Sequence, residues 1–315
     1  MTSSPFPCVR VPRAMPVAVL GLLAAAALPA AAQEAAAPDG PFWHVSTETR
    51  AAHAFDADID SGGSFDVSRA QGVLGLTYVT SPRDSVGIAL DYTWSGYGFE
   101  GAAGLGALDP WGDLRKLSLS LPYRMALGER WDVLAIVGVA SAAESGAAID
   151  RGVTGSGLLA VSYRVSDSLA LGPGFGIASQ IDDDATVFPF LVLDWQVTPA
   201  LSLTTRGDGP AVDGPQATLT WRPAPAWSLG LGAAWESKRY RLADDGPVPG
   251  GVGQNEAWPV YLSLAYGDPR AFQVYGFGGY RLGGELTVED RDGVLAASSG
   301  YADAPFLGAG LRLAW

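Results

Sequence analysis

Few residues have side chains that could take part in catalysis, and they lie on the first predicted strand. His44, Ser46 and Glu48 alternate in the sequence, so on a strand they share one face at a spacing of about 7 Å. Activation of a serine by a histidine requires a hydrogen bond of about 2.6–3.2 Å, which neighbours on one row rarely make. The chain has no GxSxG elbow, HExxH motif or phosphate loop. We therefore predict no catalytic residue, metal site or cofactor, and an acyl hydrolase would need a partner from another strand.

Charged residues show a clearer pattern, because in fourteen segments they keep to one face with a period of two. The other face is apolar, as in Leu229 and Leu231. An arginine or lysine on a lipid-facing row costs roughly 2–4 kcal/mol at the membrane midplane. The segregation therefore predicts lipid on one side of each strand and a lumen on the other. The predicted lumen residues are the basic Arg50, Arg69, Lys116, Arg124, Arg164, Arg206, Arg222, Lys238, Arg281 and Arg312 and the acidic Glu48, Asp91, Asp132, Asp194, Glu236 and Glu285.

The charge of these inward residues bears on function. Ten are basic and six are acidic, and a basic pore lining favours anions. The alternative is that charges of both signs pair with one another and only solvate or cross-link the inner wall. Both interpretations remain open at this point.

Turns set the number of strands. Six short breaks rich in Pro, Gly, Asp and Ser alternate strictly with seven longer, acidic, glycine-rich connections. The short breaks are 81–85, 128–130, 166–168, 198–200, 223–226 and 267–270, and the long connections are 56–66, 99–115, 141–152, 181–186, 207–215, 239–256 and 287–304. This predicts 14 strands, with 12 or 16 as alternatives. The predicted fold is all-β, a transmembrane up-and-down antiparallel β-barrel over 42–315 with short periplasmic turns and periplasmic termini.

Aromatic residues gather beside the short turns, where amphipathic rings lie at the level of lipid headgroups. This predicted girdle comprises Tyr78, Tyr123, Trp131, Tyr163, Trp195, Trp221, Trp227 and Tyr266. A soluble β-sandwich or barrel also alternates, but its apolar face is the interior and its tryptophans scatter. The clustered rings therefore favour the membrane barrel.

A second aromatic set falls on inward rows of the predicted strands. It comprises Phe188, Phe190, Tyr261, Tyr275 and Phe277. One interpretation is a track for an apolar or ring-bearing solute. The other is packing against a loop folded inward, or an incorrect register near a strand end.

The long connections hold twenty-one acidic and five basic residues. One interpretation is binding of divalent cations, either free calcium or ions that bridge lipopolysaccharide phosphates. Calcium takes 6–8 oxygen ligands, however, and the segment 56–63 only approaches an EF-hand loop. Solvated loops are the simpler explanation.

The start of the chain has the features of a secretory signal peptide. Two arginines precede an apolar stretch that is shorter than the about 20 residues of a transmembrane helix, and Ala32 ends a small-residue cleavage site. We predict a signal peptide over 1–32 and a short periplasmic tail over 33–41. Cleavage would remove Cys8, the only cysteine, and make the net charge of −13 still more negative. That balance argues against a nucleic-acid partner.

Two resemblances enter at the C-terminal third. The last segment, LGAGLRLAW, resembles the signal that outer-membrane barrels present to their assembly machinery, which implies recognition of Leu311, Leu313 and Trp315. The segment 241–293 resembles outer-membrane barrels grouped as domain of unknown function number 6268. That family implies a fold and no activity.

The sequence thus predicts a protein of the bacterial outer membrane. The leading hypothesis is a narrow passive channel for small solutes with slight anion preference. The alternatives are a structural or surface-interaction barrel that acts through its acidic loops, and an outer-membrane hydrolase. Expected partners are outer-membrane lipids, lipopolysaccharide and the barrel-assembly machinery. Fourteen strands allow either a narrow passage or one occluded by loops.

Overall fold

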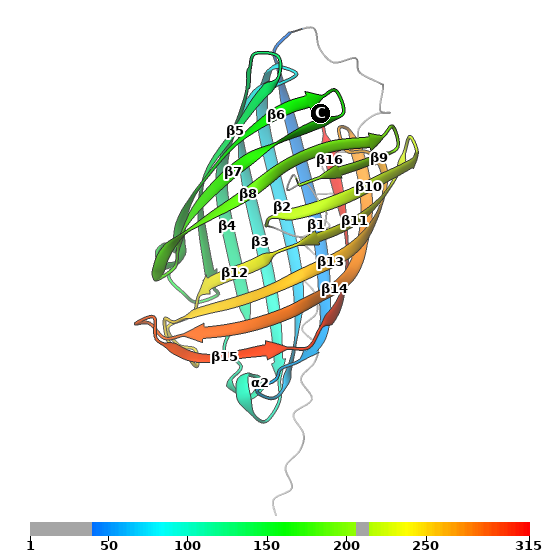
Figure 1. The fold of residues 1–315 in the computed structure, drawn as a ribbon. Helices are drawn as coiled ribbons and strands as arrows, with labels where there is room; N and C mark the ends of the chain where they lie inside the picture. The colour runs from blue at the N-terminus through cyan, green and yellow to red at the C-terminus, as the bar shows by residue number, and fades with distance from the viewer. Residues whose placement is uncertain (1–39, 206–213) are drawn as a thin grey trace, which may run out of the picture. The chain divides into compact units, whose positions relative to one another are not determined.

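A computed structural model of the chain describes residues 40–205 and 214–315. Residues Ala37–Trp315 form one compact unit (Figure 1). The predicted signal peptide and nearly all of the predicted tail over 33–41 lie outside the described residues, as does Arg206.

The described chain consists almost entirely of strands. They are β1 (Phe42–Asp58), β2 (Ser64–Ser81), β3 (Asp84–Glu100), β4 (Asp113–Leu127), β5 (Trp131–Glu144), β6 (Val153–Ser166), β7 (Leu169–Gln180), β8 (Asp183–Thr198), β9 (Leu201–Thr204), β10 (Gln216–Ala224), β11 (Trp227–Ala234), β12 (Glu236–Arg241), β13 (Val252–Asp268), β14 (Phe272–Glu289), β15 (Leu295–Tyr301) and β16 (Ala304–Ala314). The helical segments are α2 (Gly104–Leu108) and the 3-10 turn η1 (Ile149–Gly152).

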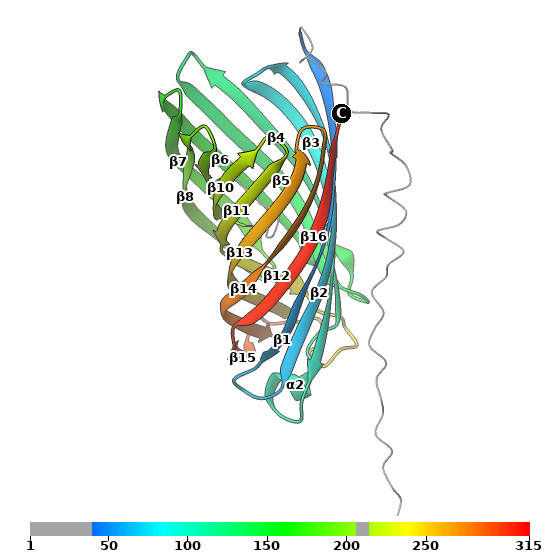
Figure 2. The same cartoon turned by 90° about the vertical axis from the view of Figure 1, so that its right-hand side faces the viewer.

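These strands form one sheet that closes on itself. β11 and β12 follow one another along β13, and β15 and β16 follow one another along β14, so the ring has 14 strand positions. Neighbours in the ring are antiparallel, and β1 pairs with β16 to close it, with Glu48 opposite Arg312. Figure 2 shows the seam, where the red β16 lies beside the blue β1. The prediction of a 14-stranded antiparallel barrel is confirmed.

The apolar faces of the strands point outward. On β11, Leu229 and Leu231 are 39% and 50% exposed, whereas Gly230 and Gly232 between and beside them are buried. The same alternation on the other strands surrounds the barrel with an apolar belt, as a lipid environment requires. The soluble alternative, in which these leucines fill a dry centre, is excluded. No helix among the described residues is long and apolar enough to cross a membrane.

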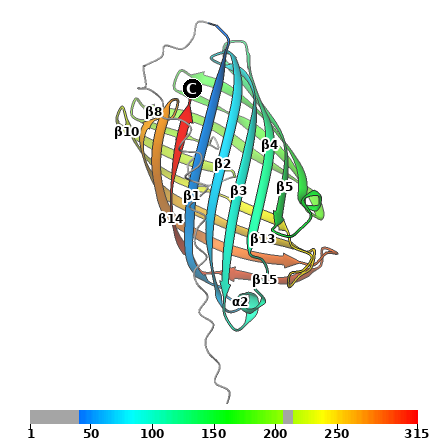
Figure 3. The same ribbon diagram turned by 180° about the vertical axis from the view of Figure 1, so that it is seen from behind.

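The two ends of the barrel differ. One end, here called the turn end, carries the short connections, of which two contain glycines at positive φ, Gly128 (+69°) and Gly267 (+109°). β1 starts there and β16 ends there, since Val45 and Trp315 exchange backbone hydrogen bonds. The other end, the loop end, carries α2 and β15, which lie at the bottom of Figures 1 and 3.

Strands at the loop end are longer than predicted. The predicted loop 181–186 is a two-residue turn before β8, and most of the last predicted loop is the end of β14 and the whole of β15. Polar and acidic residues at this end therefore continue the ladder beyond the apolar belt. Their composition predicted loops because it reflects the polarity of the side chains and not the pairing of the backbone.

Proline positions coincide with gaps in the ladders. The β3–β4 ladder is interrupted beside Pro122 and the β6–β7 ladder beside Pro173. Proline has no N–H to donate, so a strand tolerates it where the ladder is open.

The loop half of the barrel interior is filled. Inward side chains of several strands pack with α2 and the segment before β4 into one apolar cluster, the loop-end core. Its aromatic members are Phe65, Tyr97, Phe99, Trp111, Tyr240 and Tyr301. The rings of Phe65 and Tyr301 meet edge-on with centroids 4.8 Å apart. Of the two predicted arrangements, a narrow passage or an occluded one, the described residues form the occluded one at this end.

Candidate functional site in the lumen

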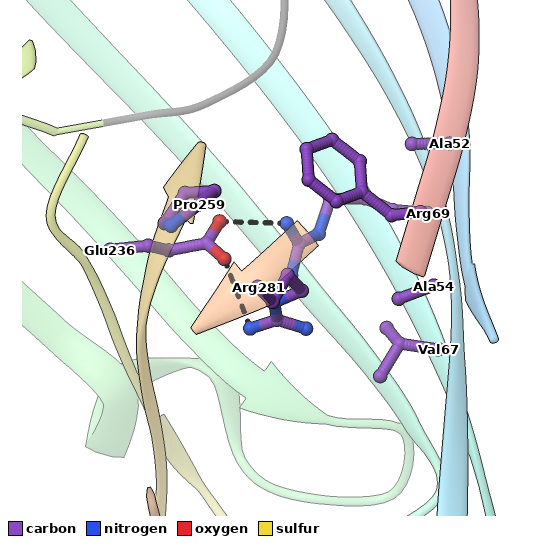
Figure 4. A pocket seen from close by; sticks show the side chains of 8 residues that line it. Ala52, Ala54, Val67, Arg69, Glu236, Pro259 and Arg281 are labelled. Carbon is purple, nitrogen blue, oxygen red and sulfur yellow. Dashed lines mark hydrogen bonds and ion pairs between the residues drawn. The ribbon is translucent and has the colours of Figure 1, made fainter. Parts of the chain in front are cut away.

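One buried carboxylate gathers three cationic side chains inside the barrel. Glu236 is 3% exposed. Its Oε1 lies 2.8 Å from Arg69 Nη1 and 3.2 Å from Lys238 Nζ, and its Oε2 lies 3.1 Å from Arg281 Nη2. Arg69 comes from β2 and Arg281 from β14, which are separated in the ring by β1 and β16. The side chains thus meet across the interior (Figure 4).

A small cavity adjoins this cluster. It is lined by Ala52, Ala54, Val67, Arg69, Glu236, Pro259, Arg281 and Phe306. Most of its wall is apolar, so the charged groups are held in a medium that screens them poorly. In such surroundings the ion pairs stabilise the fold only when all partners are present, because removal of one side chain leaves the others buried without a counter-charge.

Glu236 reaches the lumen because β12 departs from the line of β11. The β11–β13 ladder stops at Ala233, and pairing resumes at Glu236 after a gap. Pro259 of β13 lies opposite this gap and offers no N–H for a ladder bond. At its far end β12 touches β5 across the ring, where Arg241 pairs with Ala143 in a parallel bridge.

We call residues 236–251, which comprise β12 and the segment after it, the strap. Two arginines fix it to the rim. Arg239 donates to Glu289 of β14 from Nη1 at 3.1 Å, and Arg241 Nη2 lies 2.6 Å from Asp182 Oδ2. The strap therefore lies over the loop end and is held by opposite charges.

Loop acids serve these internal contacts. Asp182 and Glu289 bind the strap, and Glu144 accepts a hydrogen bond from the backbone N–H of Ala243 at 2.9 Å. Within 40–205 and 214–315, no group of three or more His, Cys, Asp or Glu side chains is arranged to hold a metal ion.

A polar network covers the wall formed by β16, β1, β2 and β3. Arg312 Nη2 lies 2.7 Å from Glu48 Oε2. Arg50 donates to Gln71, and Gln71 donates to Asp91. On this wall the inward charges pair with or bridge to one another, as the cross-linking interpretation predicts.

Arginines also gather at the turn end. Arg83 Nε lies 2.9 Å from Asp132 Oδ1, and Arg164 Nη2 lies 3.7 Å from Asp132 Oδ2. The hydrogen bond to Asp132 raises the pKa of Arg83 above its ordinary value. Arg124 stands opposite Leu134 in the β4–β5 ladder, and Arg222 is exposed on β10.

Two further predicted lumen charges lie on inward rows of other strands. Lys116 stands opposite Thr93 in the β3–β4 ladder, and Asp194 stands opposite Ala170 in the β7–β8 ladder. Both are partly exposed.

Glu285 does not face the lumen, and its prediction was wrong. Gly283 adopts a φ of +57°, and the β13–β14 register shifts beside it. The alternation on β14 therefore slips by one residue, so Leu286 enters the loop-end core and Glu285 is exposed. There Glu285 accepts a hydrogen bond from Ser298 at 2.6 Å. A bulge of this kind leaves no trace in a two-residue alternation.

The five inward aromatic residues divide into two groups. Tyr261, Tyr275 and Phe277 are buried in a second apolar cluster, and Tyr275 also donates to Glu48 at 2.5 Å. Phe188 and Phe190 remain partly exposed. The first group is therefore covered by packing, although against residues of neighbouring strands and not against a loop folded inward, while the rings of the second group face the lumen.

Aromatic side chains surround the turn end. Three ring pairs join neighbouring strands, Trp43 with Tyr78, Trp131 with Tyr163, and Trp227 with Tyr266, at centroid distances of 4.8–5.0 Å. The remaining predicted girdle residues, Tyr123, Trp195 and Trp221, are exposed.

The predicted girdle left out the outward rings nearer the loop end. Trp235 and Trp258 pack with centroids 4.7 Å apart, and Tyr280 is exposed. These rings flank two of the long polar connections, 239–256 and 287–304, and this position is the sequence signal that could have identified them.

The residues considered for catalysis are not arranged for it. Among the described residues no hydrogen bond joins His44 to Ser46, and Glu48 is held by Arg312. The other histidine, His53, lies on an outward row with Nδ1 3.0 Å from Ser68 Oγ. Among the described residues, no carboxylate forms a hydrogen bond with the His53 ring, so they form no Ser-His-acid triad there.

Comparisons with known proteins agree with the fold. No family model and no curated protein matches the chain, so its resemblance to family 6268 stays a prediction. The chain is similar to an outer-membrane channel from Pseudomonas putida F1 (12% identity, TM-score 0.44, covering 89% of this chain and 97% of that one). It is also similar to the P. putida toluene transporter TodX (10%, 0.38, 88% and 90%) and to the KdgM porin (8%, 0.35, 85% and 98%). Because these TM-scores are below 0.5, the fold assignment rests on the strand pairing described above.

Proposed function

We propose that this chain is a narrow passive channel of the bacterial outer membrane for small solutes, with a slight preference for anions. The observation that carries the proposal is the contrast between the two halves of the lumen. Toward the turn end, inward side chains such as His44 and Leu134 are partly exposed inside a closed wall. At the loop end the core and the strap fill the interior. A solute then passes this end only when the strap moves aside, so the strap limits the route.

The anion preference is supported by the pairing pattern in the lumen. Glu236 is shared by three cations and Asp132 by two arginines. A solute that carries negative charge therefore meets cationic groups that already share their carboxylates.

We place the turn end in the periplasm, because short turns of outer-membrane barrels lie there. The apolar belt would then contact lipid, and the loop end would meet lipopolysaccharide. Leu311, Leu313 and Trp315 would serve as the signal for the assembly machinery. Trp315 is well exposed on the last strand position, next to the seam. We take the barrel to act without catalysis.

Currents through planar bilayers test the proposal. With a salt gradient across the membrane, the wild-type protein should give small currents whose reversal potential has the sign of anion preference. The Arg291→Ala variant, changed at an exposed loop position, should behave like wild type. Cation preference would contradict the anion assignment. If neither the wild type nor the strap-released variant Arg239→Ala/Arg241→Ala, which lacks the two arginines that fix the strap, conducts, the channel assignment is contradicted.

A further inference from the structure

One wall of the lumen is apolar. It is formed by inward side chains of β5, β6 and β8, and we define it as Leu134, Ile136, Leu158, Ala160, Phe188 and Phe190. The ladders place them in two adjacent rows across four strands. Ile136 stands opposite Leu158, Leu158 opposite Gly176, and Gly176 opposite Phe188. Leu134, Ala160, Gly174 and Phe190 form the second row in the same way.

The described residues do not bury this apolar wall completely. All its members except Ala160 are partly exposed, and none belongs to either buried apolar cluster. The tips of the Phe188 and Phe190 rings lie over Gly176 and Gly174. Glycine leaves room for the rings to lie close to the wall. Their outer faces are therefore left toward the lumen.

The inward aromatic residues of β13, β14 and the loop-end core are covered, by contrast. Tyr261, Tyr275 and Phe277 pack together with Phe306, and the rings of the loop-end core pack against one another. Leaving apolar surface in contact with water costs roughly 25 cal/mol per Å². A solute that covers this apolar wall therefore gains favourable binding free energy.

Cations border the apolar wall on its turn-end side. Arg124 is the ladder partner of Leu134, and Arg164 lies on the inward row of β6 that also contains Ala160. The Arg164 side chain is 41% exposed. Its ion pair with Asp132 spans 3.7 Å, and Asp132 is already hydrogen-bonded by Arg83.

Carboxylates at this edge do not outnumber the arginines. They are Asp132, Asp84 beside Arg83 and, on β8, Asp194, against Arg83, Arg124 and Arg164. An apolar surface beside a cationic edge is complementary to a molecule with an apolar body and one acid group.

We propose that the lumen binds small amphipathic anions, namely carboxylates whose aromatic or aliphatic body is large enough to cover the apolar wall. The apolar body lies on the apolar wall and the carboxylate points toward Arg164 and Arg124. This inference rests on the proposed channel function and names the solute class that the channel selects.

Equilibrium dialysis on the purified barrel in detergent tests the site without relying on transport. Benzoate, acetate and benzyl alcohol serve as probes. We expect benzoate to bind at least about tenfold more tightly than acetate, since the ring covers the apolar wall. Similar constants for benzoate and acetate would overturn the proposal.

Variants separate the two halves of the site. The double variant Phe188→Ala/Phe190→Ala should weaken benzoate binding about tenfold. Phe175→Ala on the outward face of β7, where the ring is 60% exposed, is the matched control and should leave it unchanged. Arg164→Gln should weaken benzoate but not benzyl alcohol. If Phe188→Ala/Phe190→Ala does not fold, Phe188→Leu/Phe190→Leu is the milder change, which removes the two rings but leaves apolar side chains, and it should still weaken benzoate relative to acetate. Unchanged benzoate binding in the folded variants would contradict the site.

Transport measurements distinguish failure of this inference from failure of the channel. Anion currents with no preferential benzoate binding would refute the solute class and leave the channel intact. Preferential benzoate binding with no flux in wild type or in the strap-released variant would refute the channel and leave the site intact.

Discussion

At the scale of single residues, the interior of this barrel is organised by a few shared carboxylates. Glu236 meets Lys238 of its own strand and also Arg69 and Arg281, which come from distant parts of the chain. Each charge has lost most of its hydration, so each depends on its partners. The Glu236 carboxylate therefore contributes more to the stability of the fold than the carboxylate of a surface glutamate does.

Replacing Glu236 by glutamine should destabilise the barrel by about 3 kcal/mol, because three buried cations lose their shared counter-charge. Urea unfolding in lipid vesicles, followed by tryptophan fluorescence, measures the change. Glu285→Gln is the control, since Glu285 is exposed on the outer face. Equal losses in both variants would show that the buried cluster has no special role.

The sequence alternation predicted only in part which of these side chains face inward and what they contact. Alternation assigned the inward face of Glu48, Asp132 and Arg312, whose contacts lie within the barrel. It failed at Glu285, because a single glycine at positive φ inverted the faces after it. It also gave no partners, since Glu236 and Arg69 meet across the lumen and are separated by 167 positions.

At the scale of elements, the strap is the feature that departs from a plain barrel. β12 continues β11 in sequence but leaves its line opposite Pro259 and bridges to β5. The short turns were predictable because Pro, Gly, Asp and Ser mark them. The strap was predicted as a loop, because an inward-folded polar segment has the same composition as a solvated one.

Releasing the strap should widen the passage. In Arg239→Ala/Arg241→Ala, the pairs with Glu289 and Asp182 are lost, so the strap should leave the loop end more often. We expect a larger single-channel conductance, by about twofold or more, with the reversal potential still of anion sign. Arg270→Ala, in an exposed turn at the other end, should leave the conductance at the wild-type value. A conductance equal to wild type in the double variant would mean that the strap does not limit the route.

At the scale of the whole molecule, the barrel turns its apolar side chains outward. This property was predictable from sequence, because exclusion of charge from lipid acts on every strand at once and so accumulates over the chain. The occlusion of the loop half was not predictable, since it depends on which loops fold inward.

Charge placed on the apolar belt should be costly. Leu231→Arg should reduce the free energy of unfolding by about 2–4 kcal/mol, whereas Thr220→Arg, on an inward row of neighbouring β10, should cost less than half as much. Urea unfolding in vesicles compares them. A larger loss for Thr220→Arg would reverse the assigned faces.

The seam between β1 and β16 joins residues as far apart as Glu48 and Arg312, which are 264 positions apart. Such distant pairing makes assembly slow. Until it forms, both seam strands display unsatisfied backbone donors and acceptors that invite association with other chains. A chain whose other ladders had all formed would therefore expose two unpaired strand edges until the seam closed, and association between copies would be fastest at that stage.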